Sequence, residues 1–217
     1  MKEYFTPERY SLIERVDDLI FRQYMTDEIN IIKSVKRDIL IDIGSGYGRI
    51  VPLIQDQFEK IISIDNSRPM IVELKKRYSD IYAIQADATY LNNILSVQEK
   101  SLIIVLQNTL GTWEGNYKEL LKNISLFAKE NDSEVILSIC KADALKTWGL
   151  QLYSKLESLV GKPDYMKCDL EAGVFISNTG YSSKWFTEKE IWRMRHDMKG
   201  MSRSLQTPYY EILHFKF

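Results

Sequence analysis

ILIDIGSGYGRI, residues 39–50, sets a short β-branched run in front of three glycines at alternate positions. The run contains Asp42 and has the length and composition of a buried strand. Gly44, Gly46 and Gly48 then predict a turn into a helix, where backbone N–H groups approach a ligand closely because no Cβ intervenes. We therefore expect a small polar group to bind at this turn.

Strand-like runs and amphipathic stretches alternate on the C-terminal side of the turn. Short runs rich in apolar and β-branched residues lie at 38–43, 60–65, 81–86, 101–107 and 134–140. Stretches with apolar residues three and four apart lie at 49–58, 67–78 and 116–130. Strands that are apolar on both faces are typical of a parallel sheet covered by helices on both sides. The sequence therefore predicts an α/β fold with a doubly wound sheet.

The two ends of the chain depart from this alternation. Near the C-terminus, Thr187 and Glu190 form the pattern of a capping box that opens a helix over 186–198. Two strand-like runs, 202–206 and 209–217, then follow across a two-residue turn, which predicts an antiparallel hairpin.

Two further regions fit neither pattern. Residues 1–37 predict two helices that form an N-terminal lid, and 141–184 predict a helix followed by irregular chain. Both regions are candidate substrate covers. The first 25 residues are also rich in aromatic rings, namely Tyr4, Phe5, Tyr10, Phe21 and Tyr24. These rings either dock the segment onto the sheet or close over a ligand.

Composition and charge exclude several classes of protein. The 217 residues are 45% hydrophobic and 27% charged with a net charge of −1, as in a single water-soluble domain with no general attraction for nucleic acid. No apolar run approaches the ~18 residues of a membrane helix, and the start lacks a signal peptide, so we expect a cytoplasmic protein with no membrane partner.

The two cysteines, Cys140 and Cys168, are interpreted as two reduced thiols. No cluster has metal-ligand spacing, so no metal is expected.

The glycine spacing separates two classes of nucleotide site. A dinucleotide fingerprint, G-x-G-x-x-G counted from Gly44, would place its third glycine at 49, where the chain has Arg49. No Gly-Lys-Ser/Thr follows either, which disfavours a triphosphate loop. An NAD oxidoreductase is therefore disfavoured.

Polar residues end the next strands at the same edge of the predicted sheet. Asp65 ends the second strand, where a carboxylate can accept from both hydroxyls of a ribose. Asp87 ends the third, within QADAT, and can accept from an adenine amine. The fourth run ends in LQNT, at Gln107 and Asn108. Ligands of open α/β sheets bind at this edge, so the pattern predicts a nucleoside site.

With these motifs the chain resembles the class I S-adenosylmethionine-dependent methyltransferases. LIDIGSGYGR is similar to their first motif, SIDNSRPMI to the acidic second-strand motif, QADAT to the third and SLIIVLQNTLGTW to the fourth. The resemblance implies a seven-stranded sheet in the order 3-2-1-4-5-7-6 with strand 7 antiparallel, over 38–217 with 141–184 as a variable insertion. It also implies S-adenosylmethionine as methyl donor and S-adenosylhomocysteine as product.

The resemblance further implies which residues meet the cofactor. Backbone of the glycine turn would face the methionyl part, with Asp42 near its ammonium; Asp65 would hold the ribose. The cofactor-binding residues are, in full, Tyr24, Asp42, Gly44, Ser45, Gly46, Asp65, Asn66, Met70, Asp87, Ala88, Gln107 and Asn108. Met70 could equally be a core residue, and Asp87 a turn or helix-cap residue. Glu114, the acidic residue nearest after the fourth strand, is the candidate catalytic base, with Trp113 beside it.

Three functions remain open at this point. The preferred hypothesis is methyl transfer to N or O of a small molecule by in-line displacement, which mainly requires the acceptor to be held close and straight. An RNA methyltransferase would use the basic stretch 184–203, although a solvated helix face is the simpler interpretation of that stretch. A non-catalytic cofactor-binding subunit that regulates a partner is the third. The oligomeric state is not predicted.

Overall fold

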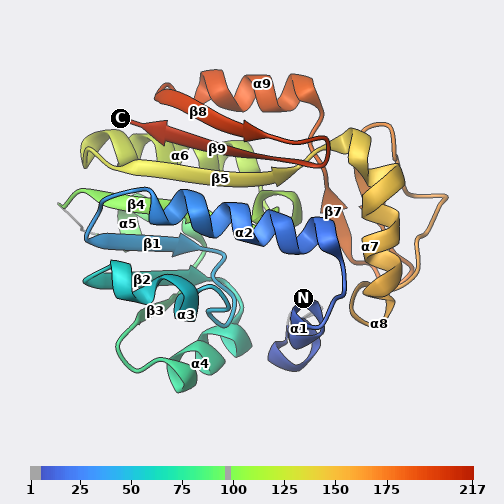
Figure 1. Cartoon of the computed structure of the whole chain (residues 1–217), viewed down its shortest axis with the longest axis horizontal. Helices are drawn as coiled ribbons and strands as arrows, with labels where there is room; N and C mark the ends of the chain where they lie inside the picture. The colour runs from blue at the N-terminus through green and yellow to red at the C-terminus, as the bar shows by residue number, and fades with distance from the viewer. Residues whose placement is uncertain (1–5, 96–98) are drawn as a thin grey trace.

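The computed structural model of the chain describes residues 6–95 and 99–217, and seven strands in it form one sheet (Figure 1). Their order is β3-β2-β1-β4-β5-β9-β8. The strands are β1 (Ile39–Ile43), β2 (Lys60–Asp65), β3 (Tyr82–Gln85), β4 (Ser101–Val105), β5 (Glu134–Cys140), β8 (Met201–Gln206) and β9 (Tyr210–Lys216). The first five are mutually parallel, and β9 runs antiparallel between β5 and β8. The predicted strand order and the antiparallel seventh strand are confirmed.

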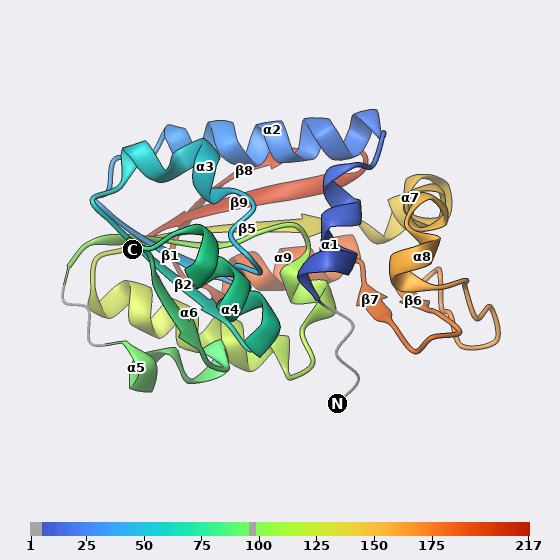
Figure 2. The same cartoon turned by 90° about the horizontal axis from the view of Figure 1, so that it is seen from below.

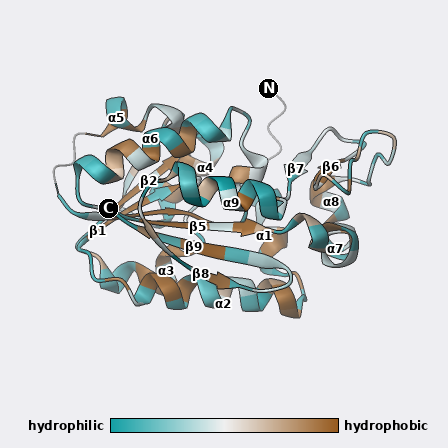
Figure 3. Cartoon of the chain, turned by 90° about the horizontal axis from the view of Figure 1, so that it is seen from above, coloured by the Kyte–Doolittle hydropathy of each residue, from teal (hydrophilic) through white to brown (hydrophobic). Residues whose placement is uncertain are grey.

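Helices cover both faces of the sheet, as expected (Figure 2). On one face lie α2 (Leu19–Lys33) and α3 (Val51–Ile54); on the other lie α5 (Leu91–Ile94), α6 (Tyr117–Glu130) and α9 (Glu188–Asp197). Successive β1 side chains alternate between these layers, because Leu40 packs with α2 while Ile39 and Ile41 pack with α6. Figure 3 shows the resulting apolar interior. α4 (Arg68–Arg77) packs against β3.

The helix predicted over 49–58 is shorter than expected. Gly48 adopts a left-handed backbone with φ +80°, so regular helix starts only at Val51. After Ile54 the chain tightens into a 3-10 turn, η1 (Gln55–Gln57), and is extended again at Phe58 to enter β2. The predicted capping box at Thr187 and Glu190 is present and opens α9.

Of the two predicted covers, α1 of the N-terminal region and the insertion after β5 lie at the carboxyl ends of the parallel strands. The N-terminal segment forms α1 (Pro7–Glu14), capped by Thr6, and α2, capped by Asp18. α2 runs along the sheet, whereas α1 contacts α4 on one side and α8 on the other (Figure 2). The insertion after β5 contains one turn of π-helix, called here the π-turn (Leu145–Gly149), then α7 (Leu150–Lys155) and α8 (Glu157–Val160). It also contains a hairpin of β6 (Val174–Ile176) and β7 (Ser182–Lys184) that the sequence did not predict.

Within the described residues, no helix combines the length and the apolar character needed to cross a membrane.

Candidate active site

A cavity of about 870 Å³ opens at the carboxyl ends of β1 to β4, between α1, α2 and the insertion after β5. Eleven of the thirteen predicted site residues line it, and Asp42 and Ser45 do not. The lining members are Tyr24, Gly44, Gly46, Asp65, Asn66, Met70, Asp87, Ala88, Gln107, Asn108 and Glu114. The loops that the sequence placed at one sheet edge therefore converge on one space.

The glycine turn shapes the floor of this cavity. The N–H groups of Gly44 and Ser45 both donate to the Ile64 carbonyl, at 2.8 and 3.3 Å. Gly44 has φ +72°, and a Cβ there would lie 2.4 Å from the Thr109 methyl group, so only glycine fits. A Cβ at Gly46 would meet no described residue within 4 Å, so within the described part of the chain this backbone faces open space. A ligand can therefore approach the main chain at Gly46.

Asp65 connects the glycine turn to the next loop. Its carboxylate accepts from the Gly46 N–H at 2.9 Å and from the Ser67 N–H at 2.8 Å. Burial raises the pKa of Asp65, and these two hydrogen bonds partly oppose the rise. Each oxygen accepts one backbone bond and keeps a further lone pair. The carboxylate is thus preformed and can still accept from a ligand hydroxyl.

The residues predicted around the adenine occupy the adjoining wall. Met70 is 2% exposed yet lines the cavity, so it serves the core and the cavity together. Asp87 accepts from the Thr89 N–H at 2.9 Å and so caps the short helix after β3, which is the helix-cap role given above as the alternative. Asp87 also lines the cavity.

Strand β4 ends earlier than predicted, at two consecutive left-handed residues. Gln107 has φ 53° and Asn108 has φ 59°, conformations that non-glycine residues adopt rarely and at an energetic cost. The Asn108 amide accepts from the Cys140 N–H at 3.2 Å and donates to the Lys184 carbonyl at 2.9 Å. It therefore ties β4 to β5 and β7, and this turn points the end of β4 into the cavity.

Glu28, on α2, does not line the cavity but contacts the lining residue Gln107, and sequence reasoning missed it. One carboxylate oxygen, Oε1, accepts from the Gln107 N–H at 2.8 Å and from the Ser138 hydroxyl. The other oxygen is buried and makes no hydrogen bond with any described residue. Burial raises the pKa of Glu28 to about 7, although its hydrogen bonds and the nearby Arg49 charge pull in the opposite direction.

Asp42 completes a group of three buried acids with Glu28 and Asp65. It lies on β1 on the face covered by α2, and is 3% exposed. Burial, together with the charges of Asp65 and Glu28, raises its pKa to about 8. Three carboxyl groups that disfavour one another's ionisation form a region where a cationic ligand is stabilised.

Arg49 supplies the opposite charge at the cavity wall. One guanidinium nitrogen, Nη1, lies 3.2 Å from the Met25 sulfur, and the group sits 5.6 Å from the centre of the Phe21 ring. The other nitrogen, Nη2, is buried without a hydrogen-bond partner among the described residues. A guanidinium held in this way has a donor available for an anionic group of a ligand.

The remaining predicted residues lie toward the mouth and the aromatic wall. Glu114 lines the cavity as an exposed side chain, and Trp113 lines it beside Glu114. Tyr24 stacks on Tyr210, with ring centres 4.3 Å apart, and presents an edge to Trp148.

Of the other rings in the N-terminal segment, Tyr10 and Phe21 line the cavity. Tyr4 and Phe5 lie outside the described residues. Cys140 also lines the cavity, where burial holds its pKa far above the ordinary value, so the thiol stays protonated.

The fold was compared with known proteins. No protein-family model matches the sequence, and no curated protein matches it. Many solved structures match its fold. The PH0226 protein of Pyrococcus horikoshii OT3 superposes with a TM-score of 0.65 at 16% identity, over 99% of this chain and 95% of that one.

Two further matches are named methyltransferases. The methyltransferase domain of bacterial-CtHen1-C gives a TM-score of 0.60 at 17% identity, over 88% of this chain and 95% of that one. The Burkholderia thailandensis 1,6-didemethyltoxoflavin-N1-methyltransferase, solved with S-adenosylhomocysteine, gives a TM-score of 0.55 at 13% identity, over 97% of this chain and 90% of that one. Together with the strand order, these matches decide the architecture. The chain has the class I methyltransferase fold.

The sequence contains a signal for Glu28, which the sequence analysis missed. Tyr24, Glu28 and Ile32 recur at four-residue steps on α2, so Glu28 interrupts an otherwise apolar helix face. A carboxylate in that position is a candidate for a buried polar role. In the sequence, Arg49 stands where a dinucleotide fingerprint needs glycine, and no local pattern marks it as a ligand-binding residue.

Proposed function

We propose that this protein binds S-adenosylmethionine in the cavity and transfers its methyl group to N or O of a small molecule. The observation that carries the proposal is the charge at the cavity. Asp65 and Arg49 line it, Glu28 and Asp42 are buried close to Asp65, and the Arg49 Nη2 atom has no hydrogen-bond partner among the described residues. The cofactor carries an ammonium, a sulfonium and a carboxylate. The acids fit its cationic groups, and Arg49 fits its carboxylate.

The same charges argue against a nicotinamide dinucleotide. A pyrophosphate approaching the glycine turn would meet the Asp65 carboxylate, which already accepts the Gly46 N–H that a phosphate would need. Asp65 instead suits the hydroxyls of a ribose, and Met70 and Asn66 suit the adenine beside it. The cavity volume of about 870 Å³ lies toward the upper end of the roughly 300–1,000 Å³ that ligand sites span, which is compatible with binding of cofactor and acceptor together.

Methyl transfer needs little acid–base chemistry from the protein. The acceptor lone pair forms the bond to the methyl carbon while the carbon–sulfur bond breaks, and the sulfur keeps that electron pair as the thioether of S-adenosylhomocysteine. The acceptor proton then passes to water, or to Glu114 at the mouth when the acceptor is a hydroxyl. Helix α1 contributes the cover in this proposal, since it bridges α4 and α8 and would restrict the entry of water.

The RNA alternative receives less support. Lys184 pairs with Glu190 at 3.0 Å and Arg195 pairs with Glu211, so two of the six cations in 184–203 are already neutralised within the chain. Trp185 is the one residue of 184–203 among the described residues that line the cavity, so the cations of this stretch lie outside the lining. RNA retention that falls steeply with added salt would favour the alternative.

Calorimetry with S-adenosylhomocysteine, S-adenosylmethionine and NAD tests the proposal. We expect both sulfur compounds to bind and Asp65→Asn to weaken them by about 1–3 kcal/mol, as for loss of a charge-assisted acceptor. The exposed Asp56→Asn serves as the matched control. Tighter binding of NAD would refute the proposal. Binding without release of S-adenosylhomocysteine from any acceptor or partner would favour the regulatory subunit.

A further inference from the structure

The insertion after β5 gives the cavity a second compartment with its own chemistry. Side chains from the π-turn, α7, α8 and the segment after β7 form its wall. They are Trp148, Leu152, Leu156, Leu159, Val160 and Trp185. Each of the six is buried to 6% exposure or less. The two tryptophan rings lie 5.2 Å apart at an interplanar angle of 60°.

The polar groups in this wall are already used within the protein. The Trp185 indole N–H donates to the Tyr153 hydroxyl at 2.8 Å, and the Trp148 indole N–H donates to Asp18 at 3.1 Å. The Ser183 hydroxyl accepts from the Asn108 amide at 3.3 Å. A ligand therefore meets a surface whose hydrogen bonds stabilise the wall itself.

Charge is also absent from this side of the cavity. Residues 141–184 include eleven Asp, Glu, Lys and Arg side chains, yet every described lining residue from Cys140 to Trp185 is uncharged. The charged lining residues come from the end of the glycine turn, the end of β2, the start of α4 and the loops after β3 and β4. They are Arg49, Asp65, Arg68, Asp87 and Glu114. The cavity is thus divided into a charged half and a neutral half.

We propose that the methyl acceptor is a neutral, apolar ring compound carrying a hydroxyl or amine, seated between the tryptophans and the leucines of α7 and α8. The proposal rests on the proposed methyl transfer and specifies its substrate class. A carboxylate or phosphate placed in this compartment would lose its hydration without gaining a charged partner. A flat apolar ring would instead bury its surface against the leucine and tryptophan side chains.

Binding of a neutral fluorescent dye, N-phenylnaphthylamine, to protein saturated with S-adenosylhomocysteine tests whether this compartment takes an apolar ring compound. We expect its emission to rise on binding, and Leu156→Asp to weaken dye binding about tenfold or more, because a carboxylate would then stand in the apolar wall. Affinity for S-adenosylhomocysteine should not change. Leu126→Asp on α6, where Leu126 is 43% exposed, is the matched control and should change neither affinity. Equal dye binding by Leu156→Asp and the wild type would overturn the proposal.

Competition with the wild-type protein avoids any effect of the variant on folding. Naphthol should displace the dye at concentrations about tenfold or more below those needed for hydroxynaphthoic acid, which differs by one carboxylate. Equal or better displacement by the acid would overturn the proposed acceptor class. Dye binding with no binding of S-adenosylhomocysteine would instead refute methyl transfer and leave the neutral compartment in place.

Discussion

The Glu28 carboxylate accepts a hydrogen bond from the main-chain N–H of Gln107, 2.8 Å away, across 79 positions of sequence. Gln107 and Asn108 both have positive φ, a combination that costs on the order of 1–3 kcal/mol per residue. The carboxylate and the Asn108 amide bonds hold this turn in place. The helix that covers the sheet thereby fixes the end of β4 at the cavity.

Glu28→Gln should make stability less dependent on pH. The pKa of Glu28 is about 7 in the folded chain, raised by burial, against about 4.3 in an unfolded chain. Its stabilising contribution is therefore complete below about pH 4.3 and is lost as the pH rises through 7. The glutamine variant keeps an acceptor for Gln107 without this loss. Its unfolding free energy relative to wild type should rise by about 3 kcal/mol between pH 4.5 and 8.

Urea unfolding at intervals across this range measures the effect, with the exposed Glu130→Gln as control. Asp42, Asp65 and Arg49 stay in place in both proteins and face the same region. A constant difference between wild type and Glu28→Gln at every pH would contradict the assignment of the raised pKa to Glu28.

Arg49→Met should weaken the binding of S-adenosylhomocysteine by about 1.5–3 kcal/mol, which is the contribution of a hydrogen bond to a charged group. The expected cause is loss of the unpaired Nη2 donor beside the glycine turn. The decarboxylated analogue of the ligand should bind both proteins equally, because it lacks the group that Arg49 would hold. Calorimetry with both ligands measures this, and Arg15→Met, which lies outside the cavity lining, is the control. Equal weakening of both ligands would show that Arg49 acts on the fold of the site instead.

Binding of S-adenosylhomocysteine should release protons near pH 7, and Asp42→Asn should reduce that release. The pKa of Asp42 is about 8 because of burial and the nearby Asp65 and Glu28 charges, so this carboxyl is mostly protonated in the free protein. A ligand ammonium beside it would favour ionisation. We expect the release to fall by roughly half a proton or more in the variant. Calorimetry in buffers of different ionisation enthalpy counts the protons, and an unchanged number would remove Asp42 from the ammonium site.

The sequence predicted the parts of the molecule that depend on local pattern. Runs of β-branched residues defined the strands, and polar residues directly after them, such as Asp65 and Asp87, reached the same edge because parallel strands end together. The roles assigned to these residues toward the cofactor stay predictions.

The unpredicted parts depend on contacts between distant segments. Glu28 meets Gln107 only because α2 lies on this face of the sheet, and no local pattern specifies that contact. The neutral compartment depends on which side of α7 and α8 turns inward, and these short helices gave too weak a periodicity to decide it. The β6–β7 hairpin was missed because its strands have only three residues each.

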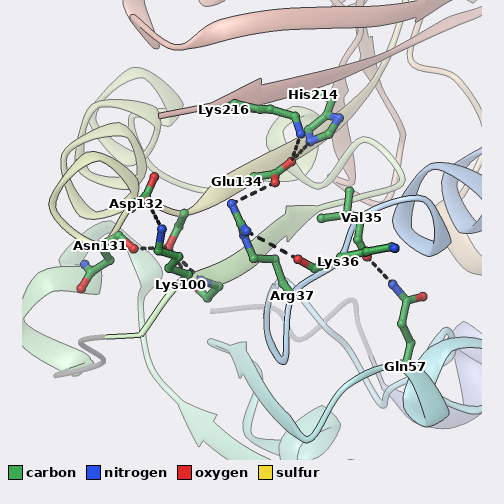
Figure 4. A network of polar contacts seen from close by, with 12 residues as sticks. Val35, Lys36, Arg37, Gln57, Lys100, Asn131, Asp132, Glu134, His214 and Lys216 are labelled. Atoms are coloured by element: carbon green, nitrogen blue, oxygen red, sulfur yellow. Dashed lines mark hydrogen bonds and ion pairs between the residues drawn. The ribbon is translucent and has the colours of Figure 1, made fainter.

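Glu134→Gln tests stability at the opposite end of the sheet (Figure 4). The Glu134 side chain is 6% exposed and contacts Arg37 at 2.9 Å, Lys216 at 3.2 Å and His214 at 2.5 Å. Burial acts to raise its pKa, but these neighbours lower it further than burial raises it, so the pKa lies below the ordinary value. The glutamine leaves the partly exposed Arg37 and Lys216 cations without their partner and should destabilise the fold by about 1–2 kcal/mol at pH 7, between the losses expected for an exposed and for a buried ion pair.

The stability that Glu134 contributes should change with pH in the direction opposite to that of Glu28. A lowered pKa gives stability that is present above the unfolded value of about 4.3 and is lost as the pH falls through the folded value. Wild type and Glu134→Gln should therefore converge in unfolding experiments below about pH 4. Asp132→Asn, which removes the exposed ion pair with Lys100 drawn in the same figure, should show no measurable loss at neutral pH. None of these residues lines the cavity, so both variants should bind S-adenosylhomocysteine with the same affinity as the wild type. A lower affinity in Glu134→Gln would mean that the two ends of the sheet are coupled.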